Sequence, residues 1–519
     1  MIDFNNGKIM EQVKEIPFFG DYDVVVAGGG VAGFGAAVAV GKRGYRVLLI
    51  EATSALGGLA TMGLVNIPLD FVSGIGREMM DELEAIEGHW HRNTNIEKHK
   101  LVLDRMVKKY NVEVLFVTSV VDAVMDGDTL RGVVIQTKTG RKYVSAKRFI
   151  DATGDSDLAF YAGAETESGR AGDGMSQACS LEFILGGVRW EEYKNSDLKK
   201  NDSRWTKMIR EDLASGLLPY ESDNHLNWMT HIPGLPQNCG MDEVSICFVH
   251  SRRCFPLDNA DLTRMYFEGR EQATMLAEYI KKRVPGFENS FLTTTASLLG
   301  VRESRRIVGE YRLTAEDIAF CRKHDDVIAI SNHGYDIHNF EETGNIKWAP
   351  IKLGDEIQYV ISNSGGFGTT TPPPDGKPVV NAKGQTAEFA EFEPNRCYDI
   401  PYRCLVPARV DNLLAAGRNL SSDIYAQSGA RLILCCLSMG EAAGVATAIS
   451  LAENITPRKI NVKALQSELI ATGCNLGQAM REIEGVSAVS TAHDEKYPNP
   501  EYKSKAVTIQ NRVNEFTRK

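Results

Sequence analysis

The stretch that decides the fold is residues 22–51, which read YDVVVAGGGVAGFGAAVAVGKRGYRVLLIE. Residues 24–27 form a short apolar, β-branched run that is typical of a buried parallel strand. Glycines at 28, 30 and 33 follow in the pattern G-x-G-x-x-G, and small residues predict a helix to about Arg43. Residues 45–50 predict a second buried strand that ends in Glu51. The stretch therefore predicts a strand–turn–helix–strand unit that binds a dinucleotide.

Each glycine of this pattern has a physical task. Gly28 permits the tight turn, Gly30 lets the backbone approach a pyrophosphate, and Gly33 lets the helix and strand pack closely. The helix that follows offers free N–H groups and the positive end of its dipole to the phosphates. Glu51 lies 18 residues after Gly33, near the distance expected for an acid that binds a ribose hydroxyl. A carboxylate there disfavours a 2′-phosphate, because the two anions would repel each other.

A second glycine pair bears on which dinucleotide binds. Residues 52–61, ATSALGGLAT, place Gly57 and Gly58 six and seven residues beyond the acid. A glycine pair followed by small residues allows the chain to pass close to a second part of a long cofactor. The segment resembles the E-x(5–6)-G-G extension of FAD proteins with the glutathione-reductase-type fold, which NAD dehydrogenases do not need.

Two later segments extend this resemblance. Strands of alternating polarity are expected at 111–124, 129–137 and 142–150, as a β-meander. The meander closes on residues 151–154, DATG, which resemble the return strand of the same FAD fold, and a strand at 413–416 ends in a glycine turn. A helix of small residues is expected from about Gly429 to Ile449. In such proteins the N-terminus of this helix points at the flavin, where its dipole stabilises the anionic reduced ring.

Four elements in this order predict FAD as the cofactor, whereas a single-site NAD dehydrogenase would leave three of them unexplained. No residue identifies a covalent link to FAD. The predicted FAD-binding residues are Gly28, Gly30, Val31, Ala32, Gly33, Glu51, Ala52, Gly57, Gly58, Ala60, Thr61, Val120, Ala152, Thr153, Gly154, Gly417, Arg418, Gly429, Ala430 and Arg431.

With these motifs the chain resembles the FAD-dependent oxidoreductase family of bacterial flavoproteins, distantly related to the flavin subunits of fumarate reductase and heterodisulfide reductase. The resemblance covers most of residues 20–455 and also rests on 284–314, 334–340 and 400–422. It implies an α/β fold: a Rossmann-like, doubly wound parallel sheet of the FAD/NAD(P)-binding type with a β-meander, plus an inserted α+β cap domain. The reaction does not follow from it, because one fold hosts many functions.

The resemblance also suggests how the chain divides into domains. A discontinuous FAD-binding domain is expected at 1–185 and 396–455, a cap or substrate domain at 186–395, and a helical, then polar tail at 456–519. The clearest cap helix is expected at 261–284 with Asp261 as its N-cap. The Gly/Pro/Thr-rich insertion at 361–399 is either a substrate-site loop or surface decoration. The tail is either a loose arm or a contact in a homo-oligomer.

Candidate catalytic residues lie in or next to the cap. Residues 294–310 predict a strand pair in which Arg302 and Arg306 share one face, either to clamp an anionic substrate or flavin, or as an Arg–Glu lattice that locks the cap to the FAD domain. Histidines in the segment SNHGYDIHNF could accept a proton, and with no third ligand at a recognisable spacing we predict no metal site. The catalytic candidates are Arg302, His333, His338, Tyr402 and Arg403.

Composition narrows the class of protein further. The formal net charge of −10 disfavours binding of nucleic acid through a broad basic surface. Ten cysteines form no C-x-x-C pair, which disfavours a redox disulfide relay and is typical of free buried thiols. The N-terminus does not resemble a secretory signal and no membrane span is predicted, so a cytoplasmic location is expected.

These observations together predict an enzyme, an FAD-dependent oxidoreductase. Its expected reaction is two-electron hydride transfer between the flavin and a small polar organic substrate, with an electron acceptor that the sequence does not identify. Two alternatives stay open. One is a flavin electron-transfer subunit that acts with a partner protein or quinone, and the other is a flavin binder without catalysis.

Overall fold

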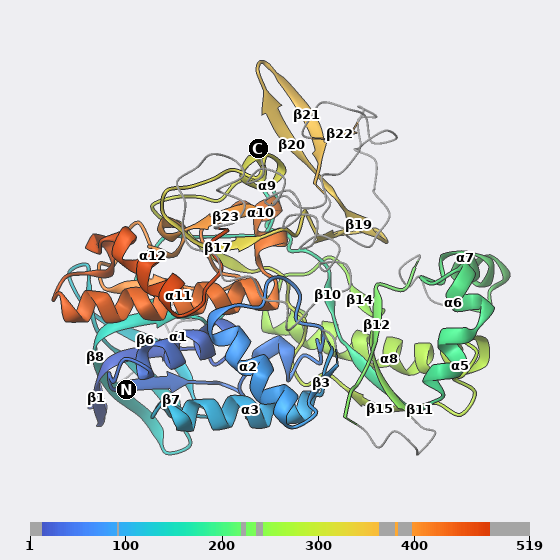
Figure 1. The fold of residues 1–519 in the computed structure, drawn as a ribbon, viewed down its shortest axis with the longest axis horizontal. Helices are drawn as coiled ribbons and strands as arrows, with labels where there is room; N and C mark the ends of the chain where they lie inside the picture. Colours follow the sequence, from blue (N-terminus) through green and yellow to red (C-terminus); the bar gives the residue numbers. More distant parts are fainter. Residues whose placement is uncertain are drawn as a thin grey trace, which may run out of the picture.

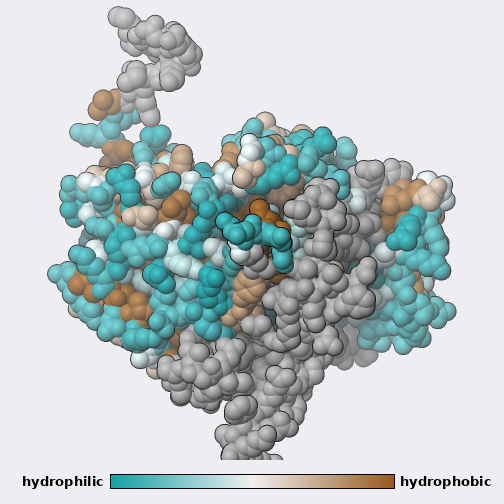
Figure 2. All heavy atoms as spheres, turned by 90° about the horizontal axis from the view of Figure 1, so that it is seen from above, coloured by the Kyte–Doolittle hydropathy of each residue, from teal (hydrophilic) through white to brown (hydrophobic). Residues whose placement is uncertain are grey.

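The computed structural model describes residues 13–90, 93–218, 225–234, 242–362, 379–381 and 397–477. Figure 1 shows a sheet-and-helix body that carries both chain ends of the described part, and a smaller unit of strands and helices beside it. Most of the predicted insertion at 361–399, and the tail after residue 477, lie outside the described residues. Hydrophilic side chains cover most of the described surface seen in Figure 2, with small separate hydrophobic patches.

The main sheet has the strand order β5-β2-β1-β8-β7-β6, with β24 paired to β8. Its strands β5, β2, β1, β8 and β24 run parallel, and β8-β7-β6 form an antiparallel meander. The bounds are β1 Phe18–Ala27, β2 Val47–Ile50, β5 Glu113–Leu115, β6 Ser119–Asp126, β7 Thr129–Thr137, β8 Gly140–Asp151 and β24 Leu413–Ala415. The predicted Rossmann-like sheet with a β-meander is confirmed.

The expected strand at 111–124 is wrong in one respect, because it is two strands. Residues up to 115 pair with β2, whereas residues from 119 pair with β7. Val117 between them has a positive φ of 51°, and its N–H donates to the Thr53 carbonyl at 3.0 Å. The chain therefore bends around the loop that follows β2 before it enters the meander.

Helix α1 (Val31–Gly41) packs along α11 (Ile433–Ala452) on one side of this sheet (Figure 1). The single helix expected at 429–449 is two helices, because α10 (Ile424–Ala430) ends before Leu432, whose backbone is extended at φ −67° and ψ 152°. Helix α11 is long and apolar enough to span a membrane, but 89% of its most apolar window is buried inside the protein.

The smaller unit contains a four-stranded sheet, β12-β13-β11-β15, next to the long helix α8 (Asn259–Arg283). Its strands are β11 Phe183–Val188, β12 Trp228–His231, β13 Asp242–Cys247 and β15 Phe291–Thr295. The predicted N-cap of α8 is wrong: Asp258 caps the helix, whereas Asp261 accepts from Phe255 N at 2.7 Å and pairs with Arg264. The N-cap therefore lies three residues earlier than expected.

The expected strand pair at 294–310 is also wrong. Strand β15 pairs with β11, and β16 (Arg305–Ile307) pairs with β9 (Thr166–Ser168) of the main body. Strand alternation therefore does not govern residues 302–306. Glu303 and Arg306, which alternation places on opposite faces, form a buried ion pair.

The side chains pack into two large cores. One core belongs to the smaller unit and draws its buried residues mainly from 179–301. The other runs from Val24 to Leu476 and includes side chains of 313–360. Residues 313–360 thus pack with the FAD-binding elements, although the sequence assigns them to the cap; the domain boundaries themselves stay a prediction.

The remaining elements connect these units. The helices are α2 Gly74–Ala85, α3 Ile96–Lys109, α4 Asp157–Tyr161, α5 Trp190–Asn195, α6 Asp197–Asn201, α7 Thr206–Ser215, α9 Ala315–Ala319 and α12 Val462–Ala471. The strands are β3 His89–Trp90, β4 Asn93–Thr94, β10 Cys179–Ser180, β14 His250–Ser251, β17 Val327–Ser331, β18 Ile337–His338, β19 Asn345–Ile346, β20 Trp348–Leu353, β21 Glu356–Ile361, β22 Val379–Asn381 and β23 Tyr398–Pro401. Helix α12 confirms the helix predicted at the start of the tail.

Candidate active site and cofactor cradle

The turn after β1 can be made only with glycine. Gly28 has a φ of 94°, and a Cβ added there would lie 2.4 Å from the carbonyl oxygen of Ala152. A Cβ on Gly33 would lie 1.8 Å from the carbonyl oxygen of Gly28. These contacts bring α1 against the end of β8, as the glycine pattern predicts.

Gly30 differs from its neighbours because it faces open space. It is the N-cap of α1 with no side-chain cap hydrogen bond, and a Cβ added to it would meet no atom of the described residues within 4 Å. Gly57 N donates to Gly29 O at 2.8 Å, which brings Gly58 beside Gly30. The uncapped N–H groups of α1 therefore face a glycine-lined cradle, and this geometry fits a pyrophosphate.

The Glu51 carboxylate lies at the same edge of the sheet. It accepts hydrogen bonds from Gly29 N and Thr53 N, each at 2.6 Å, and the residue is buried. The acid thus holds the glycine turn and the following loop together. Its predicted contact with a ribose hydroxyl stays a prediction.

The segment that follows β8 lies against the glycine turn that follows β24, as the sequence predicts. Asp151, at the end of β8, accepts from the hydroxyl of Thr153 at 2.7 Å, and Asn419 Nδ2 donates to the Asp151 carbonyl at 3.2 Å. Burial raises the pKa of Asp151. Arg418 pairs with Asp155 at 2.7 Å and packs against Gly154. Predicted FAD-binding residues that are more than 250 positions apart in the chain, such as Gly154 and Arg418, thus lie together at one edge of the sheet.

The other predicted FAD-binding residues occupy mixed environments. Ala60 and Thr61 are buried, and the Thr61 hydroxyl donates to Leu56 O at 2.5 Å. Val120 is half-buried in β6, and Ala52 is exposed. Gly429 packs against the carbonyl of His333 and the hydroxyl of Tyr398.

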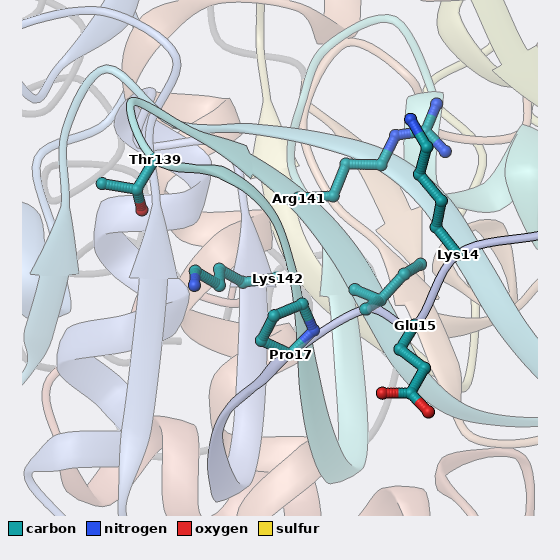
Figure 3. Close-up of a pocket in the computed structure, with 7 residues that line it drawn as sticks. Lys14, Glu15, Pro17, Thr139, Arg141 and Lys142 are labelled. Atoms are coloured by element: carbon teal, nitrogen blue, oxygen red, sulfur yellow. The ribbon is translucent and has the colours of Figure 1, made fainter.

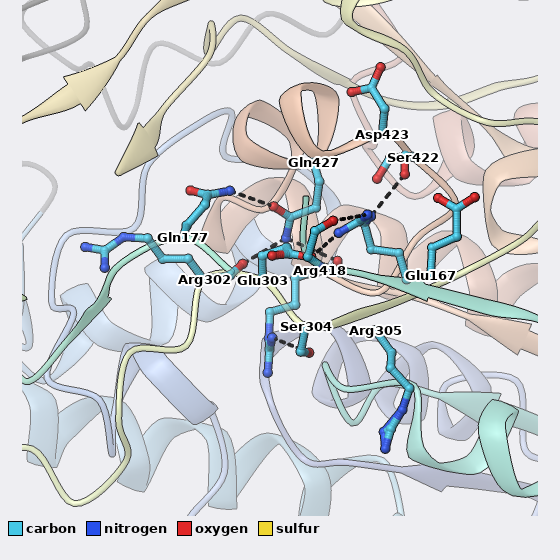
Figure 4. A network of polar contacts seen from close by, with 12 residues as sticks. Glu167, Gln177, Arg302, Glu303, Ser304, Arg305, Arg418, Ser422, Asp423 and Gln427 are labelled. Atoms are coloured by element: carbon cyan, nitrogen blue, oxygen red, sulfur yellow. Dashed lines mark hydrogen bonds and ion pairs between the residues drawn. The ribbon is translucent and has the colours of Figure 1, made fainter. Parts of the chain in front are cut away.

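Gln427 of α10 joins the cofactor cradle to a second group of polar residues. Its Nε2 donates to the carbonyls of Arg302 at 2.8 Å and Arg418 at 3.3 Å, and its Oε1 accepts from Gln177 at 3.5 Å (Figure 4). Gln427 is buried. The backbone next to Arg302 is therefore fixed to the turn that carries Arg418. We call Gln177, Arg302, His250, His338 and Asp336 the buried polar cluster.

Arg302 and two histidines form the centre of this cluster. Arg302 is 9% exposed; its NH1 donates to Ala178 O at 2.6 Å, and its NH2 lies 3.3 Å from His250 Nε2. The rings of His250 and His338 stack with centroids 4.9 Å apart. Burial and the charge of Arg302 hold the pKa of His338 well below its ordinary value, so the ring is neutral at pH 7.

Asp336 is the charged acid of the cluster. It pairs with Lys347, and it lies 3.6 Å from Arg431 and 3.7 Å from His338. Burial would raise the pKa of Asp336, but the positive charge of Lys347 and the bond to His338 lower it well below its ordinary value. The neighbouring His333 has its pKa lowered to about 4 by burial, and it is therefore neutral as well.

Glu182 and His250 belong to the same region but are absent from the sequence-based candidates. Glu182 is buried, its Oε2 has no hydrogen-bond partner among the described residues, and burial raises its pKa to about 8. It is therefore mainly protonated at pH 7. The available sequence signal was an acid within the apolar run of 181–188, LEFILGGV.

Two predicted catalytic residues lie in other surroundings. Tyr402 donates to the Pro457 carbonyl at 2.9 Å, and burial raises its pKa. Arg403 pairs with Asp326 at 2.9 Å. Neither side chain contacts Arg302 or His338 in the described structure, so their catalytic role stays a prediction without a contact to support it.

The remaining arginines near Arg302 bind acids. Arg306 pairs with Glu303, Arg305 with Asp157 at 3.3 Å, and Arg312 with Glu167 at 2.6 Å. In Figure 4 the Arg302 and Arg305 side chains point in different directions. The arginine-rich segment therefore contains both expected arrangements. Arg305, Arg306 and Arg312 form ion pairs with acids, whereas Arg302 is not part of these pairs.

A surface pocket of about 530 Å³ lies elsewhere (Figure 3). It is lined by residues of the segment before β1 and of the β7–β8 turn, namely Lys14, Glu15, Ile16, Pro17, Thr139, Arg141 and Lys142. Because the cofactor cradle is at the carboxyl end of β1, this pocket at the opposite end is not part of the candidate site. Among the described residues no group of three or more His, Cys, Asp or Glu side chains could hold a metal ion.

Comparison with known proteins assigns the family. The family model described as FAD dependent oxidoreductase matches residues 23–469, so the chain belongs to that family. The protein is accordingly an FAD-dependent oxidoreductase and its cofactor is FAD, in agreement with the glycine cradle and the sheet topology.

Individual relatives are more distant or match only briefly. Over 38 residues the chain is 66% identical to a nicotine dehydrogenase of Pseudomonas putida (strain DSM 28022 / S16). This segment covers 7% of this chain and 8% of that protein. A geranylgeranyl bacteriochlorophyll reductase-like protein of Thermoplasma acidophilum is 13% identical, with a TM-score of 0.42, 90% of this chain and 87% of that chain covered. A myxobacterial chondrochloren halogenase is 13% identical, with a TM-score of 0.38 and coverage of 95% and 90%.

Proposed function

We propose that this oxidoreductase transfers a hydride between FAD and a small polar organic molecule bound at the buried polar cluster. The observation that carries the proposal is the link through Gln427, whose amide binds the backbone of both Arg418 and Arg302. This link connects the predicted flavin end of the cradle to the cluster. When bound, FAD supplies an acceptor or donor of two electrons, and the chain supplies binding, orientation and proton transfer.

The cluster has groups suited to these tasks. Arg302 offers a buried positive charge that can orient a polar substrate. His338 is neutral at pH 7 and can accept a proton, and the Asp336 carboxylate, 3.7 Å from its Nε2, would stabilise the resulting imidazolium. Arg302 and His338 are buried, which limits the access of bulk water to the proton transfer.

The proposal extends to the location of the enzyme and the fate of its electrons. The nine cysteines of the described residues are not joined to one another by disulfides, and all but Cys321 are buried. Cysteines that stay reduced in this way support a cytoplasmic location, where the environment is reducing. The second substrate is an electron acceptor of unidentified class.

Anaerobic bleaching of the flavin absorption band tests the reaction. Sugars, hydroxy acids, amines and unsaturated acids are each mixed with the holoenzyme, and the fastest reductant is then used with variants. We expect Arg302→Ala and His338→Ala to lower the rate by at least about 100-fold, the order of a lost acid–base group, with unchanged bound FAD.

The matched control is Arg131→Ala, which removes an exposed arginine that pairs with Asp126. We expect this variant to reduce at the wild-type rate. Full activity in both cluster variants would show that the site is wrong. Reduction by another protein but by no small molecule would support an electron-transfer subunit instead.

A further inference from the structure

We infer that the substrate carries a carboxylate and that Arg302, assisted by Arg431, binds it. The inference rests on the proposed function, because it places the substrate at the buried polar cluster. It goes further by naming the chemical group that the enzyme selects.

Arg302 is a buried cation without an acidic partner among the described residues. Its described hydrogen-bond partners are the Ala178 carbonyl and the His250 ring, and neither carries a negative charge. Arg305, Arg306 and Arg312, close in sequence, each have a carboxylate partner. A buried charge is expensive unless it is paired, so an anion from outside the chain would complete the site.

The nearby acids do not neutralise this charge. Glu182 is mainly protonated at pH 7 because burial raises its pKa to about 8. His250 and His338, which lie between Arg302 and Asp336, add no negative charge. Asp336 is already shared by Lys347 and Arg431. Arg302, Lys347 and Arg431 therefore bring more positive charge to the cluster than Asp336 can balance.

The unused donors match a carboxylate. A guanidinium has five N–H groups, and the two described bonds of Arg302 use one on each terminal nitrogen. Arg431 donates to the Asp336 carbonyl at 2.9 Å, but its buried Nε has no hydrogen-bond partner among the described residues. Burial, and to a smaller extent the positive charge of Arg302, lower the pKa of Arg431 to about 10, so the two guanidinium charges repel each other. A carboxylate bound at Arg302 would offset this repulsion and could accept two parallel hydrogen bonds from the Arg302 guanidinium.

FAD is also an anion, but its phosphates have another site. The glycine cradle at Gly30 and Gly58 lies at the start of α1, and Arg418 is the arginine that packs against Gly154 in that region. In the described residues, the link from Arg302 to this region runs through its backbone carbonyl, which accepts from Gln427. We therefore expect Arg302 to bind the substrate and to leave FAD binding unchanged.

A binding experiment on the holoenzyme tests the inference without turnover. Acetate and its neutral isostere acetamide are titrated while the absorbance spectrum of bound FAD is recorded. We expect acetate, but not acetamide, to perturb the spectrum with saturation. Arg302→Gln should weaken acetate binding at least about tenfold, Arg302→Lys should recover part of it, and Arg305→Gln, which removes a neighbouring charge paired with Asp157, should leave it unchanged.

A comparison of substrates covers the case in which the Arg302 variants do not fold. With the wild-type enzyme, compounds that bleach the flavin should carry a carboxylate, and their amides or methyl esters should react at least about tenfold more slowly. Equal rates for an acid and its amide would overturn the inference. Loss of FAD from Arg302→Gln in proportion to its loss of acetate binding would also overturn it, because Arg302 would then pair with the cofactor.

The two proposals fail in different ways. If acetate perturbs the flavin in an Arg302-dependent manner but no compound bleaches it, the carboxylate site stands and the hydride-transfer proposal fails. If a neutral polyol bleaches the flavin equally fast in wild type and Arg302→Gln, and acetate has no effect, hydride transfer stands and the carboxylate inference fails.

Discussion

Gly440 of α11 lies directly against the carbonyl oxygen of Ala32 in α1. A Cβ added to Gly440 would lie 1.9 Å from that oxygen, and a Cβ on Gly444 would lie 2.4 Å from the carbonyl oxygen of Ala36. The two helices therefore touch backbone to backbone at two points about one helical turn apart. Because Ala32 follows the glycine cradle, this contact also fixes the helix terminus that faces the cofactor.

We predict that Gly440→Ala destabilises the protein and weakens FAD binding together. The methyl group has no room, and overpacking of a buried contact costs about 1–3 kcal/mol or more of unfolding free energy. Urea denaturation and a titration with FAD measure the two effects. The control, Ser438→Ala in the same helix, changes a half-buried side chain and should leave both quantities close to wild type. A Gly440→Ala protein of wild-type stability would contradict the contact.

The glycines show which parts of the site could be predicted from the sequence. Gly28, Gly30 and Gly33 have local tasks, so their spacing alone predicts the turn. Gly440 acts through a helix some 400 residues away in the chain, and no spacing rule contains that contact. The glycine content is therefore explained partly by the cofactor and partly by this helix crossing.

The candidate catalytic residues were harder to predict for a related reason. The sequence marks Arg302 and His338, but His250, which lies between them, comes from β14 and has no motif. Strand alternation does not place the side chains around Arg302, because β16 is only three residues long and begins after Glu303. In so short a strand, local turns and ion pairs decide where the side chains point.

Breaking the buried pair between Glu303 and Arg306 should strongly destabilise the protein. Glu303 is 0% exposed and Arg306 3% exposed as side chains, so Glu303→Gln leaves a buried guanidinium without its counter-ion. Loss of one partner of such a pair costs about 3–5 kcal/mol. Denaturant unfolding measures the loss. The control is Asp126→Asn, whose pair with Arg131 is exposed and worth less than about 1 kcal/mol; equal effects of the two substitutions would refute the prediction.

Glu182 should make stability depend on pH. Burial raises its pKa from 4.5 to about 8, so the folded state holds a proton that the unfolded chain releases. Unfolding free energy from this group is therefore greatest below about pH 4.5 and falls as the pH rises toward 8, by at most about 1.4 kcal/mol per pH unit.

Glu182→Gln should remove this dependence, since the amide does not titrate. Urea unfolding of both proteins at several pH values between 5 and 8 measures their free energies of unfolding. As the pH rises, the variant should become more stable relative to the wild type. Glu97→Gln on the exposed face of α3 serves as the control. A constant difference between wild type and Glu182→Gln across this range would show that the carboxyl does not stay protonated in the folded protein.

Alanine substitutions at Gly30 and Gly28 should have different effects: the first should weaken FAD binding, and the second should destabilise the fold. In the described part of the chain a Cβ on Gly30 meets no atom within 4 Å, and its φ of −60° suits any residue. Gly30→Ala should therefore leave the FAD-free protein within about 0.5 kcal/mol of wild-type stability. The same methyl group would stand where the backbone must approach the pyrophosphate, and we expect FAD affinity to fall on the order of 100-fold, or about 2.7 kcal/mol.

Gly28→Ala is the matched control: its φ of 94° and its contact with Ala152 predict an unstable protein even without FAD. Fluorescence titration with FAD and thermal unfolding of the FAD-free proteins test both predictions. If a stable Gly30→Ala protein bound FAD with wild-type affinity, the pyrophosphate would not bind at the start of α1.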